Sequence, residues 1–184
     1  MDSMKRTLIV LDFLEKLKTR EGWSSETQLH TAYFLFQALF ENFRDYQFFL
    51  FRRCIVSFDL ADDLTGMRAD SLISATVNEY PLMPALSITA SGHRFKATYA
   101  GTLDQAMMPL IDFVASKLEN RTHVEGERLA VAFYMKNNHP EIDTGSLYRK
   151  LMEARPGLKE EEAQETIHEM GVILEESRHI PVPA

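Results

Sequence analysis

The sequence has a single cysteine, Cys54, in 184 residues. One thiol cannot form an internal disulfide, and it is too few for a zinc site built on several cysteines. We therefore expect a reduced chain in the cytoplasm. The sequence also lacks a Gly-rich phosphate loop, a His-x-x-x-His pair and a Cys-x-x-Cys pair. It predicts no metal, no cofactor and no catalytic residue.

Long apolar runs are absent as well. The longest, TAYFLFQALF at residues 31–40, is much shorter than the roughly 20 residues that a membrane helix needs. Near the N-terminus, Asp12, Glu15 and Lys16 interrupt the apolar residues too early for a signal peptide. We expect a soluble protein with no membrane contact.

The chain has fewer basic than acidic residues. The chain has 20 Lys and Arg against 27 Asp and Glu, a net charge of −7. Phosphate binding depends on cations, so this balance disfavours a nucleic-acid partner. A local basic face remains an alternative, and it would be assembled from Lys5, Arg6, Lys16, Lys18, Arg68, Arg94 and Lys96.

The residues that are present indicate a packed, mainly helical chain, since 45% are hydrophobic. Three- and four-residue spacing of apolar side chains predicts seven helices, at about 4–20, 25–43, 58–69, 102–120, 126–138, 144–154 and 159–177. Pro109 either kinks the fourth helix or lies in its first turn. Ser57 is expected to cap the third helix, and Thr144 or Ser146 the sixth.

Strand signals are few and short. QFFLFR at residues 47–52 is rich in aromatic residues and predicts a buried strand. Two further runs, at about 72–78 and 85–90, flank the turn-prone NEYPLMP and predict a hairpin. Gly92 is expected to end that hairpin.

This order predicts an α+β, mostly α fold. Residues 1–98 would form a winged-helix-like domain, with the strand at 47–52 added to the small hairpin sheet. Residues 99–184 would form a helical extension packed on that domain. Covering helices are required, because a sheet this small is not stable alone.

Four segments carry a resemblance to a known family: QLHTAYFLFQALF, FFLFRR, SFDLADDLTGMRADSLI and GERLAVAFYMKNN. Together they resemble the YwgA-like and phage-associated, Panacea-type winged-helix proteins over most of residues 25–135. The positions that match the family pattern are Tyr33, Phe34, Leu35, Ser57, Leu60, Asp63, Leu64, Leu72 and Ile73. The resemblance implies a regulatory role, antitoxin-like or associated with phage defence.

One signature of that family is missing. Where it has His-Gly-Pro-Tyr before the serine, this chain has Arg53-Cys54-Ile55-Val56. The Gly-Pro turn chemistry is therefore lost. Either other residues rebuild the turn, or the strand runs on and the helix starts abruptly.

The candidate partner-binding residues are Arg52, Arg53, Asp59, Asp62, Tyr80, Leu82 and Met83. An aromatic residue and a methionine in a loop between two prolines suit a protein interface, although they can equally cap the open face of the sheet. The neighbouring arginines could activate the Cys54 thiol, but an inert, half-buried thiol is the preferred interpretation. The clustered aspartates are better explained as a solvated helix face than as a metal site.

The third helix is the one that enters DNA in a winged helix. Here its four aspartates oppose one arginine, Arg68, so phosphates would repel it. We therefore predict a non-enzymatic regulatory protein that binds a protein partner and forms a possible homodimer. The alternatives are a DNA-binding transcriptional regulator and, third, a subunit or enzyme with an unrecognised site.

Overall fold

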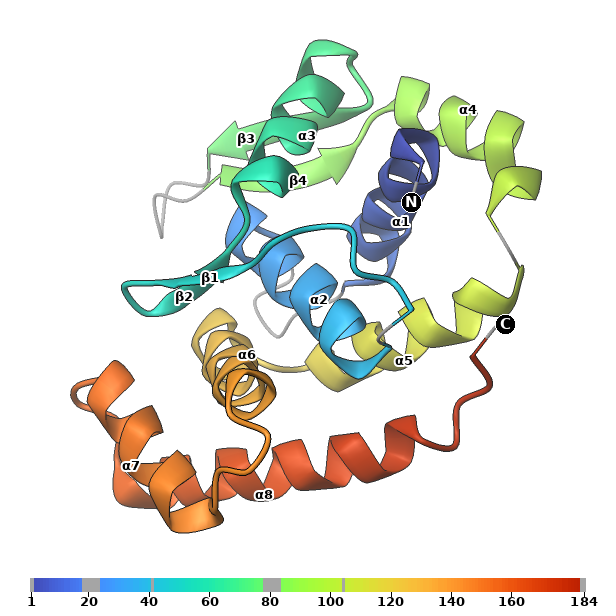
Figure 1. The fold of residues 1–184 in the computed structure, drawn as a ribbon. Coiled ribbons are helices and arrows are strands. Elements are labelled where there is room, and N and C mark those ends of the chain that lie inside the picture. The colour runs from blue at the N-terminus through green and yellow to red at the C-terminus, as the bar shows by residue number, and fades with distance from the viewer. Residues whose placement is uncertain (1, 18–23, 41, 78–83, 104, 183–184) are drawn as a thin grey trace.

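The computed structural model describes residues 2–17, 24–40, 42–77, 84–103 and 105–182. Within these ranges the chain forms eight α-helices and two antiparallel sheets of two strands each. The predicted α+β, mostly α class is confirmed. Figure 1 shows both sheets on the side of the molecule away from the last helix, α8 (Glu160–Ser177). No helix in these ranges has the length and apolar character needed to cross a membrane.

Helix α2 (Glu26–Leu39) lies at the centre of the core, as its apolar character predicts. Every residue from Gln28 to Phe36 is buried. Three helices pack around it: α1 (Ser3–Lys16), α5 (Met108–Leu118) and α6 (His123–Asn138). The helix begins at Ser25, whose side-chain oxygen accepts a hydrogen bond from the Gln28 N–H at 3.1 Å.

Aromatic rings fix how α1 meets α2. Phe13 of α1 meets Tyr33 and Phe36 of α2 edge to face, with centroid distances of 6.2 and 6.0 Å. Tyr33 and Phe36 are 5.9 Å from each other. Such pairs add about 0.5–1.5 kcal/mol each beyond the burial of their area. This cluster packs the middle of α2 against α1.

The first strand differs from the prediction. Strand β1 (Phe49–Phe51) pairs with β2 (Cys54–Val56), in the register Phe49 to Val56. The prediction that residues 47–52 join the later hairpin sheet is wrong, because the chain turns back at Arg52-Arg53 and makes a separate two-stranded sheet. The prediction of a buried strand is also wrong, since Phe49 and Phe51 are exposed.

The chain then follows the predicted order. Strand β2 runs on to Ser57, which caps α3 (Phe58–Ala69), so no Gly-Pro-like turn intervenes. The hairpin is confirmed as β3 (Ile73–Val77) and β4 (Pro84–Ile88). Its loop, 78–83, lies outside the described residues.

Helix α4 (Ala90–Tyr99) is absent from the predicted elements, because Gly92 resembles a hairpin exit. The glycine instead permits close packing. A Cβ at Gly92 would lie 2.2 Å from the Leu72 carbonyl oxygen. Helix α4 therefore rests directly on the backbone that precedes β3 (Ile73–Val77).

Two short 3-10 helices, Ala100–Thr102 and Gln105–Met107, lead to the C-terminal helices. Pro109 lies in the first turn of α5, one of the two positions predicted for it. Helix α6 begins earlier than expected, at a capping box between Thr122 and Glu125. Helix α7 (Thr144–Ala154) is capped by Asp143, whose carboxylate accepts from the Ser146 N–H at 2.9 Å, and the two predicted caps are wrong.

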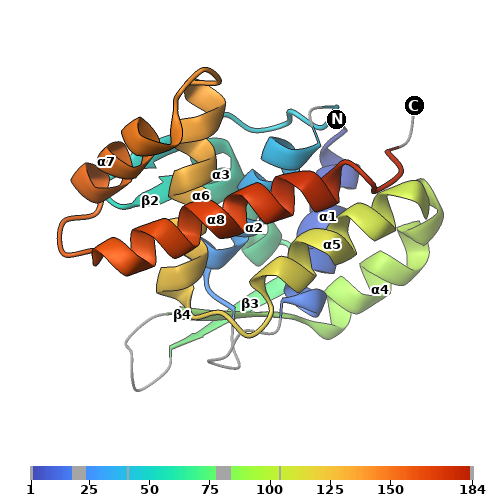
Figure 2. The ribbon, with the colours of Figure 1, turned by 90° about the horizontal axis from the view of Figure 1, so that it is seen from below.

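The C-terminal helices pack on the N-terminal ones through α6, which contacts α2 on one side and α8 on another. Figure 2 shows α8 crossing α6. Arg121 pairs with Glu169 of α8 at 2.8 Å, and Lys117 of α5 pairs with Glu176. The predicted domain boundary at residues 98/99 falls at the end of α4.

Candidate interaction surfaces

The predicted residues Arg52 and Arg53 form the tip of the β1–β2 hairpin. Both are exposed, and neither makes an ion pair within the described ranges. Arg52 has a φ of 57°, the left-handed region that glycine and asparagine favour. Its guanidinium lies over the Phe51 ring, 5.5 Å from the centroid. The tip therefore presents two unneutralised cations on a tight turn.

Exposed aromatic rings lie along β1 and at the start of α3. Phe49, Phe51 and Phe58 are 39%, 56% and 66% exposed, respectively. The Phe49 and Phe58 rings are 6.1 Å apart, so the hairpin and the start of α3 share one surface. We call Phe49, Phe51, Arg52, Arg53 and Phe58 the hairpin patch.

Asp59 and Asp62 lie beside the hairpin patch, exposed on α3. Their neighbour Asp63 turns inward. It accepts hydrogen bonds from Arg6 at 3.1 Å and from the Tyr46 hydroxyl at 2.6 Å. The acidic face of α3 therefore combines two solvated carboxylates with one that holds α3 against α1.

The C-terminal side of the hairpin tip, at Arg53 and Cys54, contacts Glu127 and Arg155. Arg155 donates to the Arg53 carbonyl at 2.9 Å and lies 3.6 Å from a Glu127 carboxylate oxygen. Burial raises the pKa of Cys54 to about 11, and the Glu127 carboxylate beside it acts in the same direction. Burial also raises the pKa of Glu127, although Arg155 opposes that shift. A thiol in this setting is a poor nucleophile at neutral pH.

Histidine and serine come together at the start of α3 without forming a nucleophile. Buried His30 accepts a hydrogen bond at Nδ1 from the Ser57 backbone N–H, at 3.1 Å. The Ser57 hydroxyl accepts from the Leu60 N–H at 3.4 Å, as a helix cap does. Glu26 lies 4.0 Å from His30 and 3.1 Å from Arg68. The hydrogen bond with His30, followed by those from Arg68, lowers the pKa of Glu26. The cluster positions α3.

Most of the candidate nucleic-acid-binding cations are neutralised within the chain. The ion pairs are Arg6 with Asp63, Lys16 with Asp112, Arg68 with Glu26, and Lys96 with both Asp12 and Glu15. Lys5 lies near the start of α1 and Arg94 is exposed on α4. Lys18 falls outside the described residues. The structure therefore does not bring these cations together as one unopposed basic face.

The other candidates, Tyr80, Leu82 and Met83, also fall outside the described residues. No group of three or more His, Cys, Asp or Glu suited to a metal ion occurs among the residues that are described.

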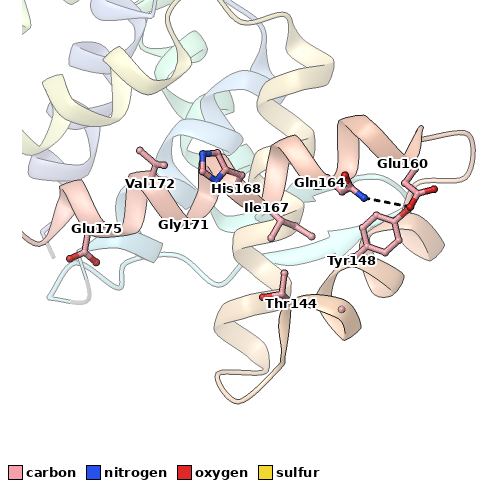
Figure 3. Close-up of a pocket in the computed structure, with 10 residues that line it drawn as sticks. Thr144, Tyr148, Glu160, Gln164, Ile167, His168, Gly171, Val172 and Glu175 are labelled. Atoms are coloured by element: carbon pink, nitrogen blue, oxygen red, sulfur yellow. Dashed lines mark hydrogen bonds between the residues drawn. The ribbon is translucent and has the colours of Figure 1, made fainter.

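A second surface, not predicted from the sequence, is an open groove of about 840 Å³ between α7 and α8. Ile167 of α8 and Tyr148 of α7 lie between the two helices (Figure 3). Glu160 and Glu175 lie toward its two ends. Gly171 lines the groove on the α8 side, near the middle of that helix.

The signal for the groove lies in the apolar stripe predicted for the last helix. Within that stripe, Ala163 and Met170 are buried, whereas Ile167, which lines the groove, is only partly buried. The stripe is thus wider than the surface that the core covers. The hairpin patch leaves no comparable signal, because exposed and buried phenylalanines look the same in a sequence.

No protein-family model, no curated protein and no solved structure matches the chain.

Proposed function

We propose that this chain is a non-enzymatic regulatory protein that binds a protein partner through the hairpin patch. The observation that carries the proposal is the grouping of three exposed phenylalanines with two arginines that lack ion-pair partners in the described ranges. Aromatic residues and arginine are enriched at protein interfaces, and arginine dominates their binding energy together with tryptophan and tyrosine.

The backbone at Arg52 gives independent support. A left-handed φ costs a residue with a side chain about 1–2 kcal/mol. Within the described chain, the Arg52 side chain makes one contact of note, with the neighbouring Phe51 ring. Strained positions of this kind concentrate at functional sites, where the side chain is required for something other than folding.

The charge of the patch indicates the partner. The two guanidinium groups favour a protein surface on which carboxylates surround an apolar pocket large enough for phenylalanine. Bidentate pairing between arginine and a carboxylate would fix the orientation of that partner.

The regulatory setting rests on the resemblance and on the order of elements. Helices α1, α2 and α3 followed by the β3–β4 hairpin support a winged-helix order, with the separate β1–β2 sheet inserted between α2 and α3. Together with the resemblance to YwgA-like and Panacea-type proteins, this order favours an antitoxin-like or phage-defence-associated role. A homodimer is compatible with that role.

The test is co-expression of the tagged chain with the product of the neighbouring gene. We expect the two proteins to co-purify, and any toxicity of that product to be relieved. The double variant Phe51→Ser, Phe58→Ser should lose both effects, because it removes the two most exposed rings of the patch. The matched control is Val124→Ser, which removes a side chain that is 59% exposed on α6.

Affinity of the purified pair should also fall at least tenfold in the double variant, measured by isothermal titration calorimetry. Undiminished binding by a folded double variant would remove the hairpin patch as the docking site. Equal losses in the double variant and in the Val124 control would do the same.

A further inference from the structure

Helix α8 has one face packed on the core and a second face that lines the groove. Its core face consists of residues buried against the rest of the chain: Ala163, Thr166, Met170, Ile173 and Ser177. A second face lines the groove: Glu160, Gln164, Ile167, His168, Gly171, Val172 and Glu175. The residues of the second face recur at three- and four-residue spacing, so they form a continuous stripe along the helix. A helix with one buried face would leave such a stripe polar, but this one contains Ile167 and Val172.

Gly171 has no packing role inside the chain. It lies within an 18-residue helix, and a Cβ added there would meet nothing within 4 Å. A helix is less stable with glycine than with alanine at an interior position, so the presence of Gly171 requires a reason other than helix stability. Gly145 lines the groove on the α7 side. Because neither glycine has a side chain, both walls of the groove are low at these positions. Low walls let a neighbouring backbone approach closely.

The α8 side of the groove is negatively charged. Helix α8 contains seven glutamates and no lysine or arginine. Arg128, Arg121, Lys117 and Arg178 neutralise four of them: Glu162, Glu169, Glu176 and Glu175. The other three, Glu160, Glu161 and Glu165, have no cation partner in the part of the chain that is described. Of these, Glu160 lines the groove, whereas Glu165 lines a separate hollow beside Arg121 and Arg128.

We propose that this groove binds a basic amphipathic helix of a partner protein. Ile167, Val172 and Tyr148 provide the apolar floor, and the unpaired carboxylate of Glu160 attracts lysine or arginine flanking the apolar stripe of that helix. The groove follows α8 from Glu160 to Glu175, which at 1.5 Å per residue is roughly 22 Å. That length fits a helix of about four turns. The site goes beyond the proposed function, since none of its lining residues belongs to the hairpin patch.

The probe is a synthetic, dye-labelled peptide of 15 residues, with leucine at helical spacing, lysine on both flanks and alanine elsewhere. We expect micromolar binding in fluorescence anisotropy. Two control peptides should bind at least tenfold more weakly: one with every lysine replaced by glutamate, and a scrambled peptide of the same composition. Equal binding of the scrambled peptide would overturn the proposal, because it would show charge attraction without recognition of a helix.

The decisive variant is Gly171→Trp, which fills the groove. It should weaken binding of the lysine peptide at least tenfold. The matched control is Gly66→Trp on α3, where a Cβ also meets nothing within 4 Å. It should bind as the unmodified chain does. Equal binding by the folded Gly171→Trp and Gly66→Trp variants would refute the groove as the site.

Sedimentation of the chain alone distinguishes a partner helix from a second copy. We expect Gly171→Trp to leave the oligomeric state unchanged. A dimer that dissociates in this variant would assign the groove to self-association and overturn the proposal. Neither result bears on co-purification through the hairpin patch, so the two sites can fail separately.

Discussion

At the scale of single residues, surroundings in space decide the chemistry of Cys54, not its neighbours in sequence. Two adjacent arginines would favour the thiolate if they faced it. In the structure Arg53 and Arg52 form an exposed turn, whereas the thiol faces Glu127. Burial and a carboxylate then both act against ionisation of the thiol.

Cys54 should therefore react slowly with iodoacetamide. A pKa near 11, against an ordinary value of 9.0, leaves about 100-fold less thiolate at pH 8. We expect the alkylation rate, measured by mass spectrometry, to be lower than that of a cysteine peptide by about that factor. The rate should rise tenfold for each pH unit up to pH 10. A rate equal to that of the free peptide would show that the thiol is activated.

Arg52 offers a second test at this scale. Its backbone φ is one that glycine adopts more easily, whereas the proposed partner binding requires its arginine side chain. Arg52→Gly should raise the free energy of unfolding by up to about 1 kcal/mol, since glycine adopts a positive φ without strain. The matched control is Ser71→Gly, which relieves the same φ of 57° at the end of α3. Urea unfolding should show a gain in both variants, and only Arg52→Gly should weaken partner binding. A loss of stability in Arg52→Gly would mean that its side chain is needed for folding.

At the scale of elements, two glycines within helices, Gly92 and Gly66, are expected to affect stability in opposite directions when replaced by alanine. Gly92→Ala should lower the free energy of unfolding by about 1–3 kcal/mol, because its Cβ would collide with the Leu72 carbonyl. Gly66→Ala should raise it by about 0.5–1 kcal/mol, because alanine favours the helix and nothing obstructs it. Thermal unfolding of the two variants would test both signs. Equal shifts in the two variants would contradict the packing of α4 against Leu72.

Elements that depend on apolar spacing could be predicted, and those that depend on unusual turns could not. Helix α3 begins and ends where its spacing and its Ser57 cap indicate. The β1–β2 hairpin was missed because its turn is Arg52-Arg53 and contains no glycine or asparagine. The exposure of Phe51 was missed for the same reason, since the strand was expected to join a covered sheet.

At the scale of the whole molecule, ion pairs between helices make stability depend on pH. A hydrogen bond from Lys96 of α4 lowers the pKa of Glu15 in α1. The bond with His30, then those from Arg68 of α3, lower the pKa of Glu26 in α2. A carboxylate with a lowered pKa stabilises the fold above its ordinary pKa of 4.5, and that contribution is lost as the pH falls further.

We therefore expect the midpoint of urea unfolding to fall between pH 5 and pH 3. Glu26→Gln should be less stable at pH 7 and should lose less on acidification. The control is Glu141→Gln, which removes an exposed carboxylate with no ion pair among the described residues. If Glu26→Gln kept the full pH dependence, its pairing would not contribute.

At the scale of the whole molecule, the net charge of −7 and the pairing of cations with carboxylates of the same chain both disfavour binding to DNA. We expect no shift of a labelled duplex at micromolar protein and physiological salt, because the chain is acidic and Arg6, Lys16, Arg68 and Lys96 are paired with carboxylates. A shift at low salt that disappears as salt is added, and that depends on Lys5 and Arg94, would instead favour the DNA-binding alternative.

Arg155 connects α7 to the hairpin tip. It caps the end of α7, which forms one wall of the groove, and it donates to the carbonyl of Arg53 at the hairpin tip. A ligand that moves α7 must move the tip or break this bond. If a ligand in the groove moved α7 in this way, linkage would require the groove and the hairpin patch to change each other's affinity by the same factor. The chain would in that case respond to two ligands, and the Arg155 guanidinium would connect their binding sites.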